Sequence, residues 1–365
     1  MPEIYNSTEL RRELHPMAEL GFDVARTADF VLAKLRALGI EASRIGDTNG
    51  VLAVIRGREP GPVLLLRSDM DALPFTEDGR TVAVHACGHD AHMAMMLETA
   101  SRLAGRIRRG TLKILFQPAE ELLTGALRMI REGVVDDVDI ALGAHIRPIQ
   151  DLPPGKVCAG VTYNAFAFPV VRFLGRIAHG SRPQLGVNAI EAAAAAVFAV
   201  NAIHLTPDSH WTVVPSRIRV EGPMNVVPPL CTMQFDIRAR ENAVMKELLD
   251  KFERAVQGAA SSVGAKAEVE LGSVGPAAEY DPEIHAELED CIRSALGPEA
   301  LAPDCGGGSE DFFFFKSHKP SIRTGYLGIG VGAVPGLHDR NMHFDDTLLP
   351  MGPRVMTAFV LRHLG

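Results

Sequence analysis

The sequence predicts an α/β protein with a mostly parallel central sheet, interrupted by an inserted α+β module. Four short apolar runs, at 51–55, 63–66, 112–116 and 140–144, are typical of buried strands, and a helical pattern at 91–103 lies among them. Between residues 166 and 274 the pattern becomes strand, helix, two strands, helix, strand. That order is the layout of a ferredoxin-like module.

The elements follow in chain order. Residues 8–39 show helical periodicity, and Gly39 is a stop signal after them. In the inserted module we expect helices near 189–205 and 241–263. After residue 275 come Gly- and Pro-rich loops, an apolar stretch at 324–333 and a closing helix at 355–364. We therefore expect residues 1–165 and 275–365 to form one domain and 166–274 to form a second, inserted one.

Composition narrows the class of partner. The chain has 365 residues, is 47% hydrophobic and carries a net charge of -8. With no long run of Lys or Arg, it lacks the charge pattern of a protein that binds nucleic acid or an anionic membrane, so a small-molecule partner is expected. The N-terminus lacks the pattern of a signal peptide and the apolar run 192–200 is far shorter than a membrane helix, so we expect a cytoplasmic protein.

The cysteines do not form a recognisable framework. There are 5 of them, scattered and without a CxxC pair. This pattern argues against both a disulfide scaffold and a zinc-ribbon motif.

Acidic residues and histidines follow three of the predicted strands. Ligands of an open α/β sheet bind beyond the carboxyl ends of its strands, so these side chains are candidates for one site. The segment HACGHDAH at 85–92 adds a thiol and imidazoles. Such a mixture suits Zn, Mn, Co or Ni better than Mg or Ca, and its size is compatible with two metal ions. The candidates are Asp69, Asp71, Cys87, His89, Glu120, Glu121 and His145.

Each of these signals has a simpler interpretation on its own. A Cys-Gly-His sequence is usually only a loop, and His92 at helical spacing from His89 is more often a hydrogen-bonding partner than a ligand. Adjacent glutamates such as Glu120 and Glu121 are often solvated. The joint occurrence of all these acidic residues, histidines and the cysteine near strand ends favours a metal site.

Eight motifs follow one another in order along nearly the whole chain. They are DMDALP (69–74), HACGHDAH (85–92), FQPAEE (116–121), ALGAH (141–145), GRIAHGSRP (175–183), MNVVPP (224–229), GGSEDF (307–312) and LHD with FDDTLLPMG (337–352). Together they resemble a family of dinuclear metallopeptidases and amidohydrolases, which includes aminoacylases, hippurate hydrolase and plant indole-acetyl-amino-acid hydrolases. The resemblance implies a zinc-peptidase-like catalytic domain and an inserted lid domain that also serves dimerisation.

The resemblance also implies a ligand set for two divalent metal ions per subunit, Mn or Zn in the first place and Co or Ni as alternatives. Cys87 stands where other branches use a bridging aspartate, and Arg67 stands where many have a ligand histidine. For the C-terminal ligand, His338 fits the family spacing to Asp346, and His343 is the alternative. The implied ligands are Cys87, His89, Glu121, His145 and His338.

Catalytic roles follow from the same resemblance. Glu120 matches the general base, which takes a proton from a metal-activated water and returns it to the leaving amine. Asp69 matches an acidic residue that orients an imidazole. His179, on the inserted module, matches a histidine that reaches the active site of the neighbouring subunit. A homodimer or a dimer of dimers, formed through the inserted module, is therefore expected.

Substrate recognition is implied less specifically. Asn225 and Arg238 match substrate-binding positions, and an arginine suits a substrate carboxylate, although Arg240 lies on the same face of the predicted strand. The segment Phe75–Val84, which the resemblance places at the border of the substrate pocket, is shorter than in relatives. The resemblance therefore does not indicate which acyl group the substrate carries. The expected activity is hydrolysis of an N-acyl or N-aroyl amino acid, or of a similar small carboxylate-bearing amide. A hydrolytic deaminase of an aromatic amino acid-like substrate and a dipeptidase are alternatives.

Other classes explain fewer residues. A thiol enzyme using Cys87 would leave Glu121, His145 and His338 without a role. Ser309 lacks the Gly that a nucleophile elbow needs, and the glycine-rich stretch 328–333 lacks the acidic residue of a dinucleotide site. A non-catalytic metal-binding or ligand-binding protein would not need a base such as Glu120.

Overall fold

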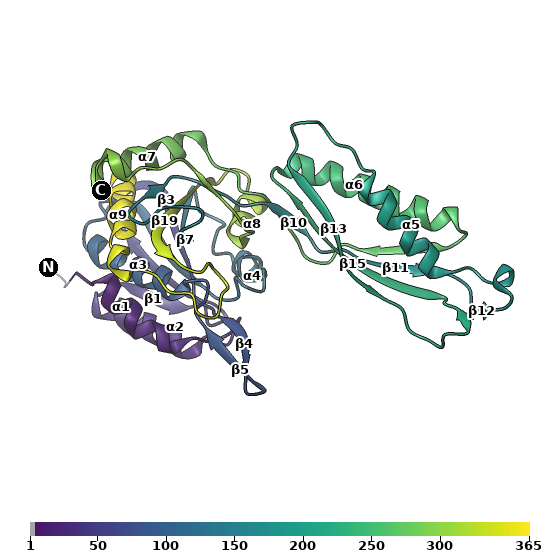
Figure 1. The fold of residues 1–365 in the computed structure, drawn as a ribbon. Coiled ribbons are helices and arrows are strands. Elements are labelled where there is room, and N and C mark those ends of the chain that lie inside the picture. Colours follow the sequence, from purple (N-terminus) through teal and green to yellow (C-terminus); the bar gives the residue numbers. More distant parts are fainter. Residues whose placement is uncertain (1–3) are drawn as a thin grey trace. The chain divides into compact units, whose positions relative to one another are not determined.

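The computed structural model describes residues 4–365, so the first three residues of the polar N-terminal segment lie outside the described part. The chain forms two compact units (Figure 1). The first comprises the described residues up to Thr162 together with Glu279–Gly365, and the second is Tyr163–Ala278. The sequence predicts the boundaries between the two domains at residues 166 and 275.

The first unit is built on a 7-stranded sheet in the order β1-β2-β6-β3-β7-β19-β8. The central strands β6, β3, β7 and β19 are parallel, and β1, β2 and β8 are antiparallel to their neighbours. The predicted mixed α/β fold with parallel central strands is confirmed, and each of the four apolar runs lies within a strand. The strands are β1 (Glu41–Arg44), β2 (Val51–Arg56), β3 (Glu59–Asp69), β6 (Arg109–Gln117), β7 (Ile140–Pro148), β8 (Val157–Cys158) and β19 (Arg323–Ala333).

Helices bury the central strands, which explains their continuous apolar sequence. In β7, every residue from Ile140 to Arg147 is buried. The helices of this unit are α1 (Ser7–Leu14), α2 (Ala25–Ala37), α3 (His89–Leu103), α4 (Gly125–Arg131), α7 (Pro282–Leu296), α8 (Phe314–His318) and α9 (Met351–Leu364).

The helical periodicity at the start of the chain is interrupted. The sequence predicts helix over residues 8–39, but α1 ends at Leu14 and α2 begins at Ala25. Pro16, in a short 3-10 turn at His15–Met17, has no amide hydrogen to continue α1, and Gly21 adopts φ 54°. The break turns one predicted helical region into two helices.

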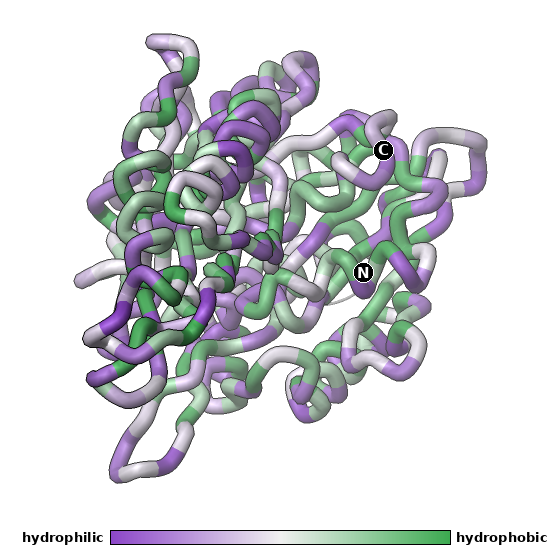
Figure 2. The backbone as a smooth tube through the Cα atoms, turned by 90° about the vertical axis from the view of Figure 1, so that its right-hand side faces the viewer, coloured by the Kyte–Doolittle hydropathy of each residue, from purple (hydrophilic) through white to green (hydrophobic). Residues whose placement is uncertain are grey.

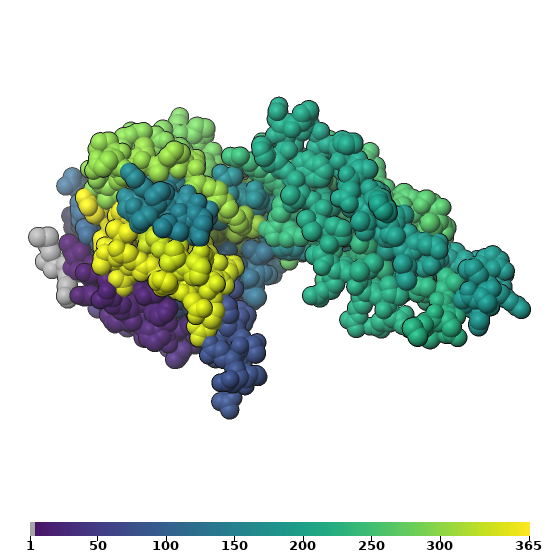
Figure 3. Space-filling view, viewed as in Figure 1, coloured from purple at the N-terminus to yellow at the C-terminus, as the bar shows by residue number. Residues whose placement is uncertain are grey.

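The short segment Phe75–Val84 belongs to a β-hairpin and is not an irregular loop. Strands β4 (Leu73–Glu77) and β5 (Arg80–Val84) pair antiparallel and project from the first unit (Figure 1 and Figure 3). Their turn is Asp78-Gly79, with φ 48° and 73°. Asp-Gly with two positive φ angles is the combination that a tight hairpin turn requires.

The second unit has the predicted ferredoxin-like order of β11, α5, β13, β15, α6 and β16. Its 6-stranded sheet runs β16-β11-β15-β10-β17, with β13 beside β15. Alternate residues of β15 are buried in a core that also includes residues of α5 and α6. The elements are β10 (Ala165–Ala167), β11 (Val170–Leu174), α5 (Ala189–Asn201), β13 (Trp211–Arg219), β15 (Leu230–Ala239), α6 (Asn242–Ser262), β16 (Lys266–Glu270) and β17 (Val274–Gly275).

Each unit has its own hydrophobic core. Along the tube in Figure 2, apolar and polar residues are interspersed over most of the chain. Among residues 4–365, no helix combines the length and hydropathy needed to cross a membrane.

Candidate metal centre

The ends of three neighbouring parallel strands bring the predicted ligands together. Asp69 ends β3, Glu120 and Glu121 follow β6, and His145 lies in β7. Cys87 and His89 join them where α3 begins, after Gly88 with φ 86°. Donor atoms lie within 4.8 Å of one another in each of three sets, which are Cys87 with His89 and His145, Cys87 with Glu121 and His338, and His89 with Glu120 and Glu121. All the implied ligands therefore belong to one connected cluster.

Backbone carbonyls set the orientation of two ligand histidines. His89 Nδ1 lies 2.8 Å from the carbonyl oxygen of Asp71, and His145 Nδ1 lies 2.6 Å from that of Ile146. A carbonyl only accepts, so each Nδ1 carries a proton, and Nε2 is the ring nitrogen left for a metal. His89 Nε2 is buried without a hydrogen-bond partner, and His145 Nε2 lies 3.4 Å from Cys87 Sγ. Both imidazoles thus present a metal-binding nitrogen to the cluster.

His92 differs from His89 and His145, because both of its ring nitrogens have hydrogen-bond partners. Its Nε2 accepts the amide hydrogen of Ile146 at 3.1 Å, and its Nδ1 donates to Asp69 Oδ1 at 2.5 Å. Both ring nitrogens are engaged, which matches the interpretation of His92 as a hydrogen-bonding partner. Asp69 therefore orients the imidazole of His92 by a hydrogen bond. The other carboxylate oxygen of Asp69, Oδ2, lies 3.6 Å from His89 Nε2.

Asp71 has a structural role that the sequence did not reveal. Its Oδ1 accepts the amide hydrogen of Glu120 at 3.0 Å, and its Oδ2 accepts that of Glu121 at 3.2 Å. The preceding residue, Ala119, adopts φ 59°, a conformation that L-residues rarely adopt. The signal available in the sequence was a second acidic residue just beyond the carboxyl end of β3.

The acidic groups of the cluster are short of compensating positive charge. Burial, and then Glu310 and Asp311, raise the pKa of Glu120 well above its usual value. Burial raises the pKa of Glu121, and burial together with Glu121 raises the pKa of Cys87 well above that of a free thiol. Cation binding at such a site displaces protons. Buried atoms without partners, Glu121 Oε1 and His89 Nε2, also fit a cation site.

The two candidates for the C-terminal ligand are distinguished by position. His338 adopts φ 67° and donates its backbone amide hydrogen to Ala86, and its Nε2 lies 3.7 Å from Glu121 Oε2. His343 directs Nδ1 to the carbonyl of Asn341 and belongs to no candidate ligand group in the described residues. The geometry favours His338.

Comparison with known proteins agrees with this arrangement. The family described as peptidase family M20/M25/M40 matches residues 65–362. The chain belongs to this family. The family resemblance seen in the motifs is therefore confirmed. The prediction that the protein is an enzyme that hydrolyses amide bonds is confirmed as well.

Relatives match over nearly their whole length. N-acetylcysteine deacetylase of Bacillus subtilis is 28% identical over 93% of this chain and 92% of its own. Hippurate hydrolase of Campylobacter jejuni is 28% identical over 98% of this chain and 96% of its own. A solved structure described as a dinuclear metal binding peptidase from the M20 family, from Bacillus subtilis, has a TM-score of 0.80 at 25% identity and covers 98% of this chain and 97% of its own.

A buried arginine of this M20 chain occupies the position where other branches have a ligand histidine. The Arg67 side chain is 1% exposed, and a guanidinium has no lone pair to offer a metal. It donates to Asp69 at 2.9 Å, to Asp311 at 2.5 Å and to Gln117 at 3.1 Å, and lies 3.0 Å from Glu310. Arg67 thus connects the GGSEDF segment to β3 and β6, a link that the sequence did not predict.

The remaining predicted site residues lie in the second unit. His179, in β12 (Ala178–His179), pairs with Val226 of β14 (Val226–Val227), and the amide hydrogen of Gly180 is donated to the carbonyl of Asn225 at 2.8 Å. His179 and Asn225 are therefore close together and exposed. Arg238 pairs with Asp236 at 2.5 Å and lies 4.9 Å from the ring centre of Phe168.

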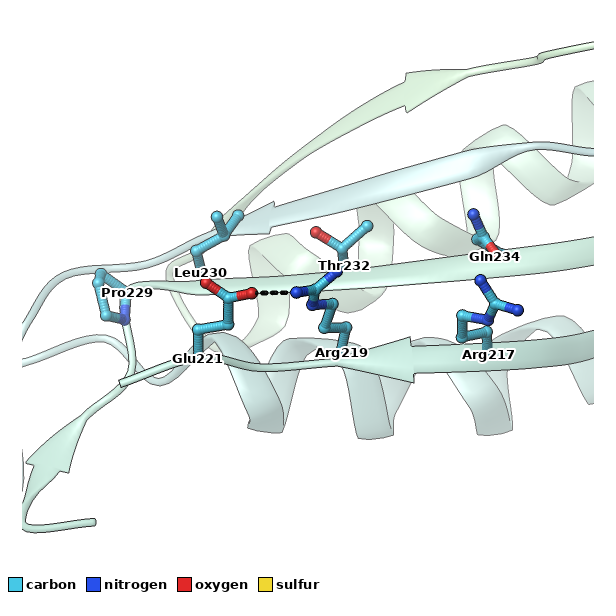
Figure 4. Close-up of a pocket in the computed structure, with 7 residues that line it drawn as sticks. All are labelled: Arg217, Arg219, Glu221, Pro229, Leu230, Thr232 and Gln234. Carbon is cyan, nitrogen blue, oxygen red and sulfur yellow. Dashed lines mark ion pairs between the residues drawn. The ribbon is translucent and has the colours of Figure 1, made fainter. Parts of the chain in front are cut away.

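The second unit also contains two pockets. One, of about 230 Å³, includes Arg238 and Arg240 in its lining. The other, of about 410 Å³, contains none of the predicted site residues, and its Arg219 pairs with Glu221 (Figure 4). The lining of the larger pocket is Arg217, Arg219, Glu221, Pro229, Leu230, Thr232 and Gln234.

Proposed function

We propose that the protein is a metal-dependent amidohydrolase acting on an N-acyl or N-aroyl amino acid, or on a similar small amide that carries a carboxylate. The observation that carries this proposal is the position of Glu120. Its carboxyl group is buried, and Oε2 lies 3.8 Å from the unpartnered Nε2 of His89. A base beside preset metal ligands is what hydrolysis needs and what a binding protein does not.

Two divalent metal ions, Mn or Zn in the first place, would be held by Cys87, His89, Glu121, His145 and His338. When bound, they supply a Lewis acid for the amide carbonyl and lower the pKa of a water molecule. Thiolate, imidazole and carboxylate donors suit these metals.

Glu120 performs the proton transfers. Its carboxylate takes a proton from the attacking water, and the resulting carboxylic acid gives that proton to the nitrogen of the leaving amine. The hydrogen bonds from the backbone of Glu120 and Glu121 to Asp71 hold both glutamates in place. One side chain can therefore serve both halves of the reaction.

The second unit supplies substrate recognition in this proposal. Arg238 and Asn225 bind the substrate carboxylate, and His179 donates a hydrogen bond to the oxyanion in the active site of a neighbouring subunit. The Arg238 guanidinium is oriented by Asp236 and by the ring of Phe168, which supports a positioned cation. The names of the hippurate hydrolase and deacetylase relatives support the substrate class.

Self-association through the second unit, as a dimer or a dimer of dimers, belongs to the same proposal. Strand β13 pairs only with β15 within the described sheet, so one of its edges is free to pair. Val214 on β13 is 50% exposed, Ile218 is 55% exposed, and Phe198 on α5 is 77% exposed. A second copy could cover these apolar side chains.

The test compares wild type with Glu120→Gln after loading with Mn or Zn. The substrates are N-acetyl, N-benzoyl and indole-acetyl amino acids, with dipeptides and an aromatic amino acid amide for the alternative reactions. We expect a loss of kcat of roughly 10²- to 10⁴-fold at unchanged metal content. The matched control is Glu59→Gln, an exposed glutamate in β3. Equal turnover by Glu120→Gln and the control would eliminate Glu120 as the base.

A further inference from the structure

Two buried cysteines outside the metal centre lie against each other. Cys158 ends β8, and Cys305 begins β18 (Cys305–Gly306). Their sulfur atoms are 3.4 Å apart, although the residues are separated by 147 positions in sequence. Both are free thiols in the structure. The sequence spacing did not suggest this pair, because the fold alone brings the two strands together.

The two thiols have different surroundings. A hydrogen bond from the Cys305 thiol, and then the backbone amides of Cys305 and Gly328, lower the pKa of Cys158 although burial opposes the shift. The pKa of Cys305 is raised, first by sharing its proton with Cys158 and then by burial. Cys158, whose thiol otherwise donates to the carbonyl oxygen of Gly160 at 3.1 Å, is therefore the more readily deprotonated of the two. The sulfur of Cys305, 3.4 Å away, is placed to attack Cys158 once that residue is oxidised.

We propose that Cys158 and Cys305 are an oxidation site, at which a peroxide converts the two thiols into an intrachain disulfide. Cys158 first gives its thiol proton to solvent. The resulting thiolate attacks one oxygen of hydrogen peroxide, the O–O bond breaks, and a sulfenic acid and hydroxide form. The Cys305 sulfur then attacks the Cys158 sulfur, the S–O bond breaks, and the departing hydroxide leaves as water with the Cys305 proton. The hydroxide from the first step recovers a proton from solvent. In total, two thiols and one peroxide yield one disulfide and two waters.

The surrounding backbone can accommodate the bond. A disulfide requires sulfur atoms about 2.05 Å apart, so the pair must approach by somewhat more than about 1 Å. Cys305 is followed by Gly306, Gly307 and Gly308, of which the last two adopt φ 120° and 84°. Glycine tolerates such angles and their adjustment better than any other residue. On the other side, Gly328 leaves room, because a Cβ there would lie 2.6 Å from Cys158 Sγ.

The position of the pair gives the disulfide a consequence for the fold. Cys158 precedes the second unit in the chain and Cys305 follows it, so the bond would close a loop that contains the whole of that unit. The glycine segment after Cys305 leads to Glu310 and Asp311, which hold Arg67. A cross-link that closes a long loop stabilises the folded state, so the oxidised protein should unfold at a higher temperature than the reduced protein.

The experiment treats the full-length, metal-loaded protein with hydrogen peroxide, quenches the excess, and titrates thiols with Ellman's reagent after denaturation. Reduced wild type has 5 thiols, and we expect the oxidised protein to retain three and to regain all of them with dithiothreitol. Peptide mapping by mass spectrometry should recover one cross-linked species containing Cys158 and Cys305.

Variants provide the controls. Cys291→Ser, a cysteine buried in α7 of the same unit, should still lose two thiols, whereas Cys158→Ser and Cys305→Ser should form no cross-link. The peptide map of wild type does not depend on how well the variants fold. The proposal is overturned if wild type keeps every thiol, if its two peptides carry separate sulfinic acids, or if Cys158→Ser still loses a pair.

Discussion

Replacing Arg67 by methionine is the sharpest test of how the metal centre is supported. Methionine has a similar length but no charge and no donor. In the wild type, the guanidinium contacts carboxylate oxygens of Asp69, Glu310 and Asp311 at 2.9, 3.0 and 2.5 Å, with its side chain 1% exposed. The substitution therefore removes the arginine counter-charge from three buried carboxyl groups, of which Asp69 keeps its contact with His92.

The magnitude follows from that burial. Removing one partner of a buried ion pair costs about 3–5 kcal/mol in the free energy of unfolding, because the remaining charge stays desolvated. Even with Arg67 present, burial raises the pKa of Asp311 to about 7. A carboxyl whose pKa is raised in the folded state contributes stability below its unfolded value, and that stability is lost as the pH rises through the folded value. The deficit of Arg67→Met should therefore be larger at pH 8 than at pH 5.

The assay is urea denaturation of metal-free wild type and variant at both pH values, so that metal binding does not contribute. The control is Arg128→Met, whose half-buried side chain pairs with the exposed Asp47 and should cost under about 1 kcal/mol. The double variant Arg67→Met with Asp311→Asn should recover part of the loss. The reasoning is refuted if Arg67→Met costs no more than the control, or if its deficit grows as the pH falls.

Three further outcomes are expected. Burial lowers the pKa of His85 to about 4, so this residue contributes stability above about pH 6.5 that is lost as the pH falls through 4. In His85→Phe, the free energy of unfolding should therefore fall by about 3 kcal/mol less than in the wild type as the pH is lowered from 7 to 4, measured by denaturation across that range. Gly125→Ala would place a Cβ 2.0 Å from the carbonyl oxygen of Pro118 and should lower the free energy of unfolding by at least about 1–3 kcal/mol, whereas Gly258→Ala, in open space on α6, should raise it by up to about 1 kcal/mol. Chelation should lower the midpoint of thermal unfolding, and adding Mn or Zn back should restore it; an unchanged midpoint would contradict a metal bound to the folded state.

Much of the fold could be predicted because its signals are local. Strands buried on both faces need continuous apolar runs, and β3, β6 and β7 were recognised in this way. The apolar run of β2 also predicted a strand, although only alternate residues of β2 are fully buried. The break between α1 and α2 was missed, since the apolar periodicity continues across it and only Pro16 and Gly21 mark it. The order of the strands was not predicted, because β3 lies between β6 and β7 through pairing with distant segments.

The candidate site was likewise predictable only in part. Motifs identified the donors, among them Cys87 and His89, and the structure brings them together. Which nitrogen of His89 faces the cluster was not predictable, since it depends on the backbone carbonyl of Asp71. The support from Arg67 also depends on Asp311, a residue 244 positions away.

The sequence by itself determined four strands of the central sheet, the helices α3, α5, α6 and α9, the family and the kinds of donor available, because composition, periodicity and motif spacing are properties of neighbouring residues. Only the tertiary structure decided which donors meet, which atom of each imidazole is free, how Arg67 compensates the buried acids, and that Cys158 and Cys305 touch. These features depend on the direction of hydrogen bonds and on the exclusion of water, and both arise only when distant parts of the chain have packed together.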